Sequence, residues 1–345
     1  MSARPWQRVS LFRWQAAGPS ELSRLSVYSE DPVSGCGRSG PGAATDVGFE
    51  GLAYEQVAQL TALLPWGGSS ALFFTGDMMT PTKAAEIALD ARQCPFQTVV
   101  FTKVDGWPCA TLAPSPYEVQ FERGEGFISK NVRSASQKNE VALSSLIPEM
   151  FWRGSGAGAW NCRHLLAPAF GAPRAALVRL HKPWLNASIG QRTPIVTALK
   201  YRYQIDIGGS SCTTWDALRW KLASGRLVFR VMLPATDWFH QFIAPWTHYV
   251  PVSADLSDLE ERFAWAEAHP NAAQQIAQRG AAIGKHTAPK NASASLIAAL
   301  NHARVTASTL PLERIFPHCH FGPCCHGHGH GHRRGHGHGH GHGHG

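Results

Sequence analysis

The segment 200–259 constrains the fold of this chain more than any other part of it. In residues 201–207, tyrosine and isoleucine alternate with arginine, glutamine and aspartate, which is the period of a strand with one buried face. Two glycines end this strand, a helix is predicted over about 213–224, and mostly apolar strands follow at 227–233 and 249–252. A strand, helix, strand succession of this length predicts a right-handed crossover within a parallel sheet.

The glycine turn and the start of the following helix form the first candidate binding segment. Thr213, with Asp216 three residues later, is typical of a helix start. Ligands of parallel sheets bind beyond the carboxyl ends of the strands, and a helix N-terminus attracts phosphate. We therefore expect a ligand at residues 210–216, which include Thr214 and Trp215. Trp215 stacks on a base or sugar or belongs to the core, and the sequence leaves both open.

The first half of the chain shows a second succession of this kind. An apolar strand is predicted at 71–74, a helix opens near Pro81, and a β-branched strand follows at 96–102. We therefore predict an α/β fold with two Rossmann-like domains that face each other across a cleft. The predicted divisions are a poorly ordered segment at 1–50, a smaller domain at 51–147, a larger domain at 148–305 and a low-complexity tail at 306–345.

Asp105 is the main candidate catalytic residue of the first domain. It follows the strand predicted at 96–102, and catalytic residues of α/β proteins collect at the carboxyl ends of parallel strands. An aspartate before Gly106 also commonly bonds its own turn backbone. Both interpretations stay open from the sequence.

Composition narrows the classes of partner. The 345 residues are 44% hydrophobic and carry a formal net charge of +8, which suits an acidic or diphosphate ligand. No Lys/Arg block is dense enough for a nucleic-acid site, and no run approaches the roughly 20 apolar residues of a membrane span. Arg4, Arg8, Arg13 and Arg24 interrupt any apolar core of signal-peptide length. We expect a monomer that binds neither nucleic acid nor membrane.

The cysteines, the glycosylation triplets and the tail leave the compartment open. Cys94 and Cys109 bracket a predicted strand and could pair in an oxidising lumen, and the triplets at Asn186 and Asn291 accept glycans only in the secretory pathway. The tail is a His-Gly repeat that cannot bury a core. Its imidazoles suit adventitious metal ions, and three representative ligands are His326, His328 and His330. The irregular spacing of the tail's imidazoles and thiols around flexible glycines argues against one preformed structural site, so we expect an adventitious metal binder rather than a metal-dependent catalyst.

Several blocks of the sequence resemble one known family. KYRYQIDI, WDALRWKLASG and PWTHYVPVSADLSDL are similar to the C-terminal half of the Rumi-type, capsule-associated (CAP) glycosyltransferases, which include protein O-glucosyltransferases and xylosyltransferases. The resemblance covers about residues 96–283. It implies the two-domain architecture known as GT-B, with the smaller domain on the acceptor side and the larger one binding a nucleotide sugar.

The resemblance also implies roles for residues of the donor site. The block Phe151-Trp152-Arg153-Gly154-Ser155, followed by Arg163, is similar to the family's donor-site signature. It assigns Arg153 and Arg163 to the leaving diphosphate, since the planar guanidinium pairs two phosphate oxygens at once. Gly154 and Ser155 complete an anion nest.

Three further positions bear on whether the site is intact. The resemblance makes Asp105 the base that takes the proton of the acceptor hydroxyl, as an inverting sugar transfer requires. Asp237 is the nearest match to a glutamate that relatives carry in an aromatic loop. Ala217 stands where many relatives carry an arginine that reaches the donor diphosphate.

Two functions follow as expectations. The first is an inverting glycosyltransferase that moves glucose or xylose from a UDP-sugar to a protein or glycan hydroxyl, without a metal cofactor, in the lumen of the endoplasmic reticulum or Golgi. The absence of a visible signal peptide leaves a cytoplasmic location or a truncated sequence open. The alternative is a degenerate relative that binds a nucleotide sugar or glycan without catalysis, with a metal-binding tail of independent role.

Overall fold

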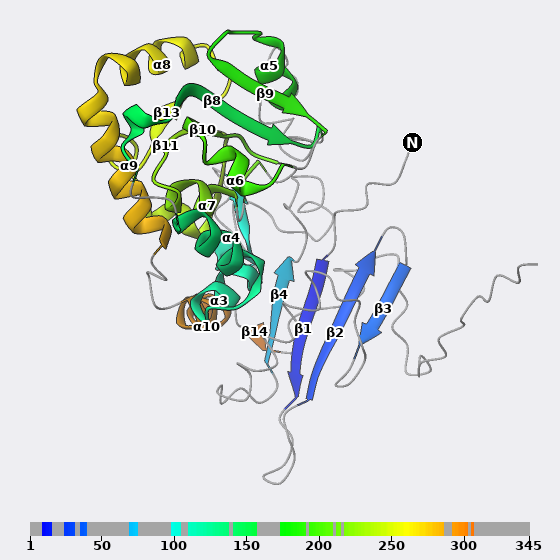
Figure 1. The fold of residues 1–345 in the computed structure, drawn as a ribbon. Helices are drawn as coiled ribbons and strands as arrows, with labels where there is room; N and C mark the ends of the chain where they lie inside the picture. Colours follow the sequence, from blue (N-terminus) through cyan, green and yellow to red (C-terminus); the bar gives the residue numbers. More distant parts are fainter. Residues whose placement is uncertain are drawn as a thin grey trace, which may run out of the picture.

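The chain has an α/β fold with two larger sheets (Figure 1). The computed structural model describes residues 9–15, 24–31, 35–39, 69–74, 98–104, 110–137, 141–156, 173–190, 193–209, 212–214, 217–285, 292–302 and 305–306. Residues 53–64 also have helical spacing, and both this segment and the helix predicted near Pro81 lie outside the described residues. The same is true of the predicted tail.

The larger half is built on a five-stranded sheet in which every described pairing is parallel. Its strands are β8 (Ile147–Gly154), β9 (Leu185–Ile189), β10 (Tyr201–Asp206), β11 (Leu227–Val231) and β13 (Val250–Val252). The spatial order is β13-β11-β10-β8-β9, so the chain moves from β8 to one side and then returns to the other. The parallel sheet predicted between residues 200 and 252 is confirmed, and its topological switch point lies between β8 and β10.

Both faces of β10 are buried, which corrects the prediction of a single buried face. Tyr203 and Ile205 pack into the main core, as predicted. On the opposite face, Gln204 is 1% exposed and Asp206 is 4% exposed. Gln204 donates a hydrogen bond to the Ala198 carbonyl in α6 (Ile195–Ala198) at 2.7 Å. Parallel sheets are commonly covered on both faces, so the polar residues of β10 bond to the covering helices rather than to water.

Two consecutive helices cover the core face of this sheet. The spacing of Leu259, Phe263 and Ala266 predicts one buried helix face, and the first of these helices, α8 (Leu259–Ala268), buries these three residues. Ser257 and Glu260, three residues apart, predict a capping box, but the N-cap is Asp258, whose Oδ1 accepts a hydrogen bond from the Ser253 N–H at 2.8 Å. The carboxylate therefore stabilises the preceding loop rather than the helix N-terminus.

The second of these helices packs closely against α7 (Ala217–Ala223). It is α9 (Pro270–Lys285), and its buried face includes Ile276, as predicted. A Cβ on Gly284 would lie 2.5 Å from the backbone nitrogen of Ala223. Such a distance is shorter than any real contact, so the absence of a side chain lets the two helices approach. Gly225, at φ +71°, ends α7 where the sequence predicted a stop.

The other large sheet is mixed. Its order is β3-β2-β1-β4-β5-β7, and β14 also pairs with β4. The strands are β1 (Val9–Gln15), β2 (Arg24–Asp31), β3 (Gly35–Ser39), β4 (Ser69–Phe74), β5 (Thr98–Val100), β7 (Ala110–Leu112) and β14 (Val305–Thr306). Strands β4, β5 and β7 are parallel, whereas β1 to β3 extend the sheet in antiparallel fashion. We expected residues 1–50 to be poorly ordered, and the structure has β1, β2 and β3 there.

Several elements join the two halves of the chain. Strand β6 (Thr102–Val104) pairs antiparallel with β12 (Ala235–Asp237), which comes from the second half. The single strand predicted at 96–102 is therefore two short strands, β5 and β6, that pair in different sheets. The C-terminal helix α10 (Ala292–His302) returns to α3 (Pro116–Glu122), where Glu122 accepts hydrogen bonds from the Ser293 N–H and hydroxyl, each at 2.9 Å (Figure 1).

A buried ion pair is one polar link between these halves. Arg219 on α7 donates from Nε and Nη2 to the two carboxylate oxygens of Glu118 on α3, at 2.9 and 2.5 Å. The Arg219 guanidinium also lies 4.4 Å from the ring centre of Phe121 and 4.1 Å from that of Phe239. Arg219 is 1% exposed, so the pair is buried away from water and salt weakens it little.

We predict that Phe263→Ala lowers the free energy of unfolding by about 3–5 kcal/mol, because the substitution opens a cavity in the core. Phe263 stacks on Trp184 with ring centres 4.2 Å apart. Urea denaturation measures the loss, and Phe127→Ala, at a side chain that is 40% exposed, is the matched control. Equal losses in the two variants would contradict the packing of α8.

We also predict that Arg219→Met destabilises the protein by about 3–5 kcal/mol, because Glu118 is left as a buried charge without its counter-ion. Arg262→Met is the control, since Arg262 and Asp258 form a partly exposed pair that should contribute only about 0–1 kcal/mol. Adding Glu118→Gln to Arg219→Met should recover part of the loss. No recovery in that double variant would show that the charge is not the cause.

Candidate functional site

A cavity of about 650 Å³ lies at the switch point of the five-stranded sheet. Residues 151–156 line it from β8 and the turn that follows, and Gly190 lines it directly after β9. The remaining wall comes from the region of α6, from Gln204 of β10, and from Trp220 and Lys221 of α7. The cavity therefore extends to the carboxyl ends of β8 and β9, the edge where parallel sheets bind ligands.

Arg153 is held in this wall by three hydrogen bonds. Its Nη1 donates to the carbonyl oxygens of Trp152 and Asn186 at 2.8 and 2.7 Å, and its Nη2 donates to Asn186 Oδ1 at 2.6 Å. The guanidinium also lies 4.4 Å from the ring centre of Phe151. These contacts preorganise the arginine on the strand rather than leaving it as a mobile surface side chain.

The side-chain amide of Asn186, the group to which a glycan would be attached, is engaged in hydrogen bonds through both its oxygen and its nitrogen. Its Oδ1 accepts from Arg153, and its Nδ2 donates to the Tyr201 hydroxyl at 3.0 Å and to Glu149 Oε2 at 3.2 Å. The triplet that it begins lies in β9 and not in an exposed loop. The structure thus explains Asn186 as a second support for Arg153, a role that the glycosylation pattern in the sequence did not indicate.

Gly154 and Ser155 adjoin a second guanidinium that the sequence analysis missed. Arg174, on α5 (Pro173–Arg179), donates from Nη1 to the Ser155 carbonyl and hydroxyl oxygens, both at 3.2 Å, and from Nε to the Gly208 carbonyl at 3.0 Å. Burial lowers the pKa of Arg174, and the Asp206 carboxylate opposes that shift. Arg174 joins the ends of β8 and β10. No local pattern marks it, because its partners are distant in sequence.

The carboxyl end of β10 carries a buried network. Lys221 Nζ donates to Asp206 Oδ1 at 2.8 Å and to the Ile205 carbonyl at 3.0 Å, and Thr214 donates its hydroxyl hydrogen to Asp206 Oδ2 at 2.6 Å. The side chains of Lys221 and Asp206 are 8% and 5% exposed. Thr214, which belongs to the segment 210–216 where we expected a ligand, is thus held at the carboxyl end of β10. Lys221 and Asp206 were not predicted as site residues.

Asp237 lies elsewhere, and it is not among the described residues that line this cavity. It caps the short helix η3 (Trp238–Phe242) by accepting hydrogen bonds from the backbone N–H groups of Phe239 and His240, at 3.1 and 3.2 Å. Burial raises the pKa of Asp237 to about 7, while the charge of Arg230 acts in the opposite direction. Burial and Arg230 both lower the pKa of His240.

Four predicted site residues lie outside the described residues: Asp105, Arg163, Trp215 and Asp216. The predicted metal ligands His326, His328 and His330 also lie outside them. The predicted strand before Asp105 includes β5, which is parallel to β4 and β7, but the short strand β6, antiparallel to β12, lies between β5 and Asp105. In that pair Thr102 is opposite Asp237, so the strand that precedes Asp105 lies beside the strand that ends at Asp237.

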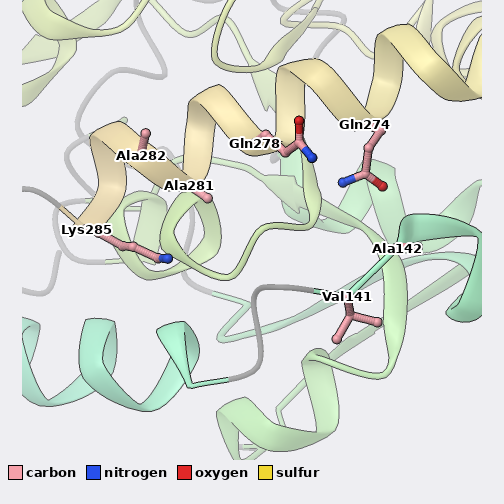
Figure 2. A pocket seen from close by; sticks show the side chains of 7 residues that line it. All are labelled: Val141, Ala142, Gln274, Gln278, Ala281, Ala282 and Lys285. Atoms are coloured by element: carbon pink, nitrogen blue, oxygen red, sulfur yellow. The ribbon is translucent and has the colours of Figure 1, made fainter.

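A second cavity, of about 540 Å³, lies between α9 and residues 141–142 (Figure 2). Its polar groups are Gln274, Gln278 and Lys285, and Gln274 Oε1 already accepts a hydrogen bond from the Leu143 N–H at 2.8 Å. This cavity is next to the segment that enters β8, at the amino edge of the sheet. That edge is opposite to the one where ligands of such sheets bind.

The described segments bear on two further classes of site, a metal centre and a membrane-spanning helix. Within them, no group of three or more His, Cys, Asp or Glu side chains is arranged to hold a metal ion. Helices long and apolar enough to cross a bilayer are also absent from those segments.

Taken from β8 onward, the sheet has the doubly wound order 2-1-3-4-5, with cationic side chains at its switch point. That order places the protein in the class of doubly wound α/β proteins, whose ligands bind at the switch point. The family Glycosyl transferase family 90 matches residues 99–287, more than half of the chain, and the chain belongs to this family.

Curated relatives resemble a shorter part of the chain. It is 37% identical over 81 residues to protein O-glucosyltransferase 2 of Danio rerio, a match that covers 24% of this chain and 16% of the relative. It is 34% identical over 101 residues to protein O-glucosyltransferase 1 of Rattus norvegicus, covering 29% of this chain and 25% of the relative. The match to human protein O-glucosyltransferase 3 is 35% over 83 residues, or 24% and 16%. The chain thus spans a quarter or less of these relatives.

We predict that Asp237→Asn removes part of the pH dependence of stability. A carboxyl whose pKa is raised on folding, here from 3.8 to about 7, binds its proton more tightly in the folded state. Its stabilising contribution is complete below about pH 4 and is lost as the pH rises through 7. The parent should therefore lose on the order of 2–4 kcal/mol relative to Asp237→Asn between pH 4 and 8, measured by urea denaturation. Parallel pH profiles for the two proteins would contradict the shift.

Proposed function

We propose that this protein is a glycosyltransferase that moves a sugar, glucose or xylose, from a UDP-sugar to a hydroxyl of a protein or glycan. The observation that carries the proposal is the position of Arg153, Gly154 and Ser155 in the wall of the cavity at the switch point. The family and the O-glucosyltransferase relatives support the same reaction class. The resemblance to Rumi-type, capsule-associated enzymes adds the UDP-sugar and the GT-B arrangement of two facing domains.

The proposed mechanism is an inverting displacement. Asp105 takes the proton of the acceptor hydroxyl as that oxygen attacks the anomeric carbon, and the bond from that carbon to the UDP oxygen breaks. Arg153 and Arg163 stabilise the negative charge that develops on the leaving diphosphate. Because arginine supplies this charge, we propose that the reaction needs no metal ion and that the His-Gly tail binds metal only adventitiously.

We further propose a monomer in the lumen of the secretory pathway, with no nucleic-acid partner. Cys212 is disulfide-bonded, and disulfides persist mainly in oxidising compartments. One observation favours a second candidate function, a degenerate relative that binds a nucleotide sugar without transferring it. At Ala217 the chain lacks the arginine that many related sequences place on the donor.

We predict that Asp105→Asn lowers the rate of sugar transfer by about 10²–10⁴-fold and leaves UDP binding intact, since only the base is lost. Arg153→Ala should weaken both, because it removes a charge-assisted contact to the diphosphate. Transfer is measured with radiolabelled UDP-sugars on a folded acceptor, and binding by calorimetry. Asp255→Asn and Arg279→Ala, both outside the described cavity wall, are the controls.

The outcomes test the assigned base and separate the two candidate functions. Full activity in Asp105→Asn would mean that another carboxylate is the base, with Asp237 the next to substitute. UDP-sugar binding without transfer in the parent would favour the degenerate relative. A parent chain that binds no UDP-sugar at all would contradict the proposed reaction.

A further inference from the structure

We propose that Lys221 is a further donor-binding residue, whose ammonium group contacts the diphosphate in the switch-point cavity. This inference rests on the proposed function, because it names a residue of the same site. Neither the family match nor the sequence patterns assign Lys221 a role.

The position of Lys221 is unusual for a lysine. Its side chain is only 8% exposed, and lysine is almost never buried unless it is paired. The pairing partner is Asp206, which the hydroxyl of Thr214 also holds. The ammonium group is therefore fixed at one point, at the end of α7 that faces β10.

The hydrogen bonds of this ammonium group leave room for a ligand. An ammonium has three N–H donors, and Asp206 Oδ1 and the Ile205 carbonyl accept two of them. Lys221 is also one of the residues that line the cavity of about 650 Å³. We infer that the third N–H is directed toward that space, where a phosphate oxygen can accept it.

The charges around the cavity favour an anion. The charged side chains among its described lining residues are Arg153 and Lys221, both cationic. Arg174 adds a third cation, which contacts Ser155 at the same edge. Asp206 bonds directly to Lys221. The cationic side chains that line the cavity match the charge of a diphosphate and not that of a neutral sugar.

A purely structural role is the competing explanation, since Lys221 neutralises the buried Asp206. Lys221→Met alone does not separate the two, because it leaves the Asp206 carboxylate buried without a counter-ion. The double variant Lys221→Met/Asp206→Asn removes both charges, and the new amide oxygen still accepts the Thr214 hydrogen bond. Lys221→Arg retains the charge. Lys285→Met, in the second cavity (Figure 2), removes an equal charge from a place without a proposed ligand.

The experiment measures binding of UDP and inorganic pyrophosphate by calorimetry, and of uridine by ligand-observed NMR, to the full chain and its variants. In the double variant we expect affinity for UDP and pyrophosphate to fall about 10- to 100-fold, the effect of one charge-assisted hydrogen bond. Uridine binding should stay unchanged. Lys221→Arg and Lys285→Met should bind UDP within about threefold of the parent, well inside the loss expected of the double variant.

Three results would overturn the inference, and they differ from one another. If the parent binds UDP and the double variant binds it equally well, Lys221 is structural and the proposed function stands. If the double variant loses binding of uridine together with binding of UDP, Lys221 supports the fold rather than the phosphate. The same conclusion follows if the double variant does not fold and Lys221→Arg binds neither UDP nor pyrophosphate. If the parent binds neither UDP nor pyrophosphate, the proposed function fails and the inference fails with it.

Discussion

The buried pair between Arg219 and Glu118 is the interaction on which the arrangement of the rest depends. It joins α7, which helps to line the switch-point cavity, to α3 in the first half of the chain. A buried ion pair contributes little net stability over an apolar contact, but the loss of one partner is costly. The pair therefore specifies how α7 and α3 pack more than it adds to the free energy of unfolding. It fixes which face of α7 meets α3, and this choice determines which residues of the helix remain to face the sheet.

The side chains of the short helix α7 lie in several different environments. Leu218 and Leu222 pack in a core cluster with Phe239. Arg219 turns toward α3, whereas Lys221, two residues later, reaches Asp206 on β10. A two-residue step rotates a helical side chain by about 200°, so the two cations point to opposite sides. The cation that stabilises the junction and the cation that reaches the candidate site are thereby kept apart.

The sequence predicted the features that depend on local periodicity. The parallel strands between residues 200 and 252 and the buried face of α8 follow from residue spacing alone, and both are confirmed. It failed where burial depends on distant covering elements: Gln204 and Asp206 were expected to face water, but α6 and α7 cover them. For the same reason Arg174, Asn186 and Lys221 were missed as site residues. Their partners are 15 to 37 residues away, and no pattern in a short sequence window records such contacts.

Asp206 raises the last physical question, because a carboxylate beside the proposed phosphate site reduces the attraction of that site for anions. Its hydrogen bond holds the Lys221 ammonium in place before any ligand arrives, so no reorganisation is needed as negative charge develops on the leaving group. Partial neutralisation also limits binding of the intact donor, whose diphosphate carries less concentrated charge than the departing UDP. Contacts that strengthen only in the transition state raise the rate, whereas uniform binding does not. In the proposed reaction, a lysine tied to Asp206 is thus better matched to the departing diphosphate than a free lysine, and it lies about one helical turn beyond Ala217.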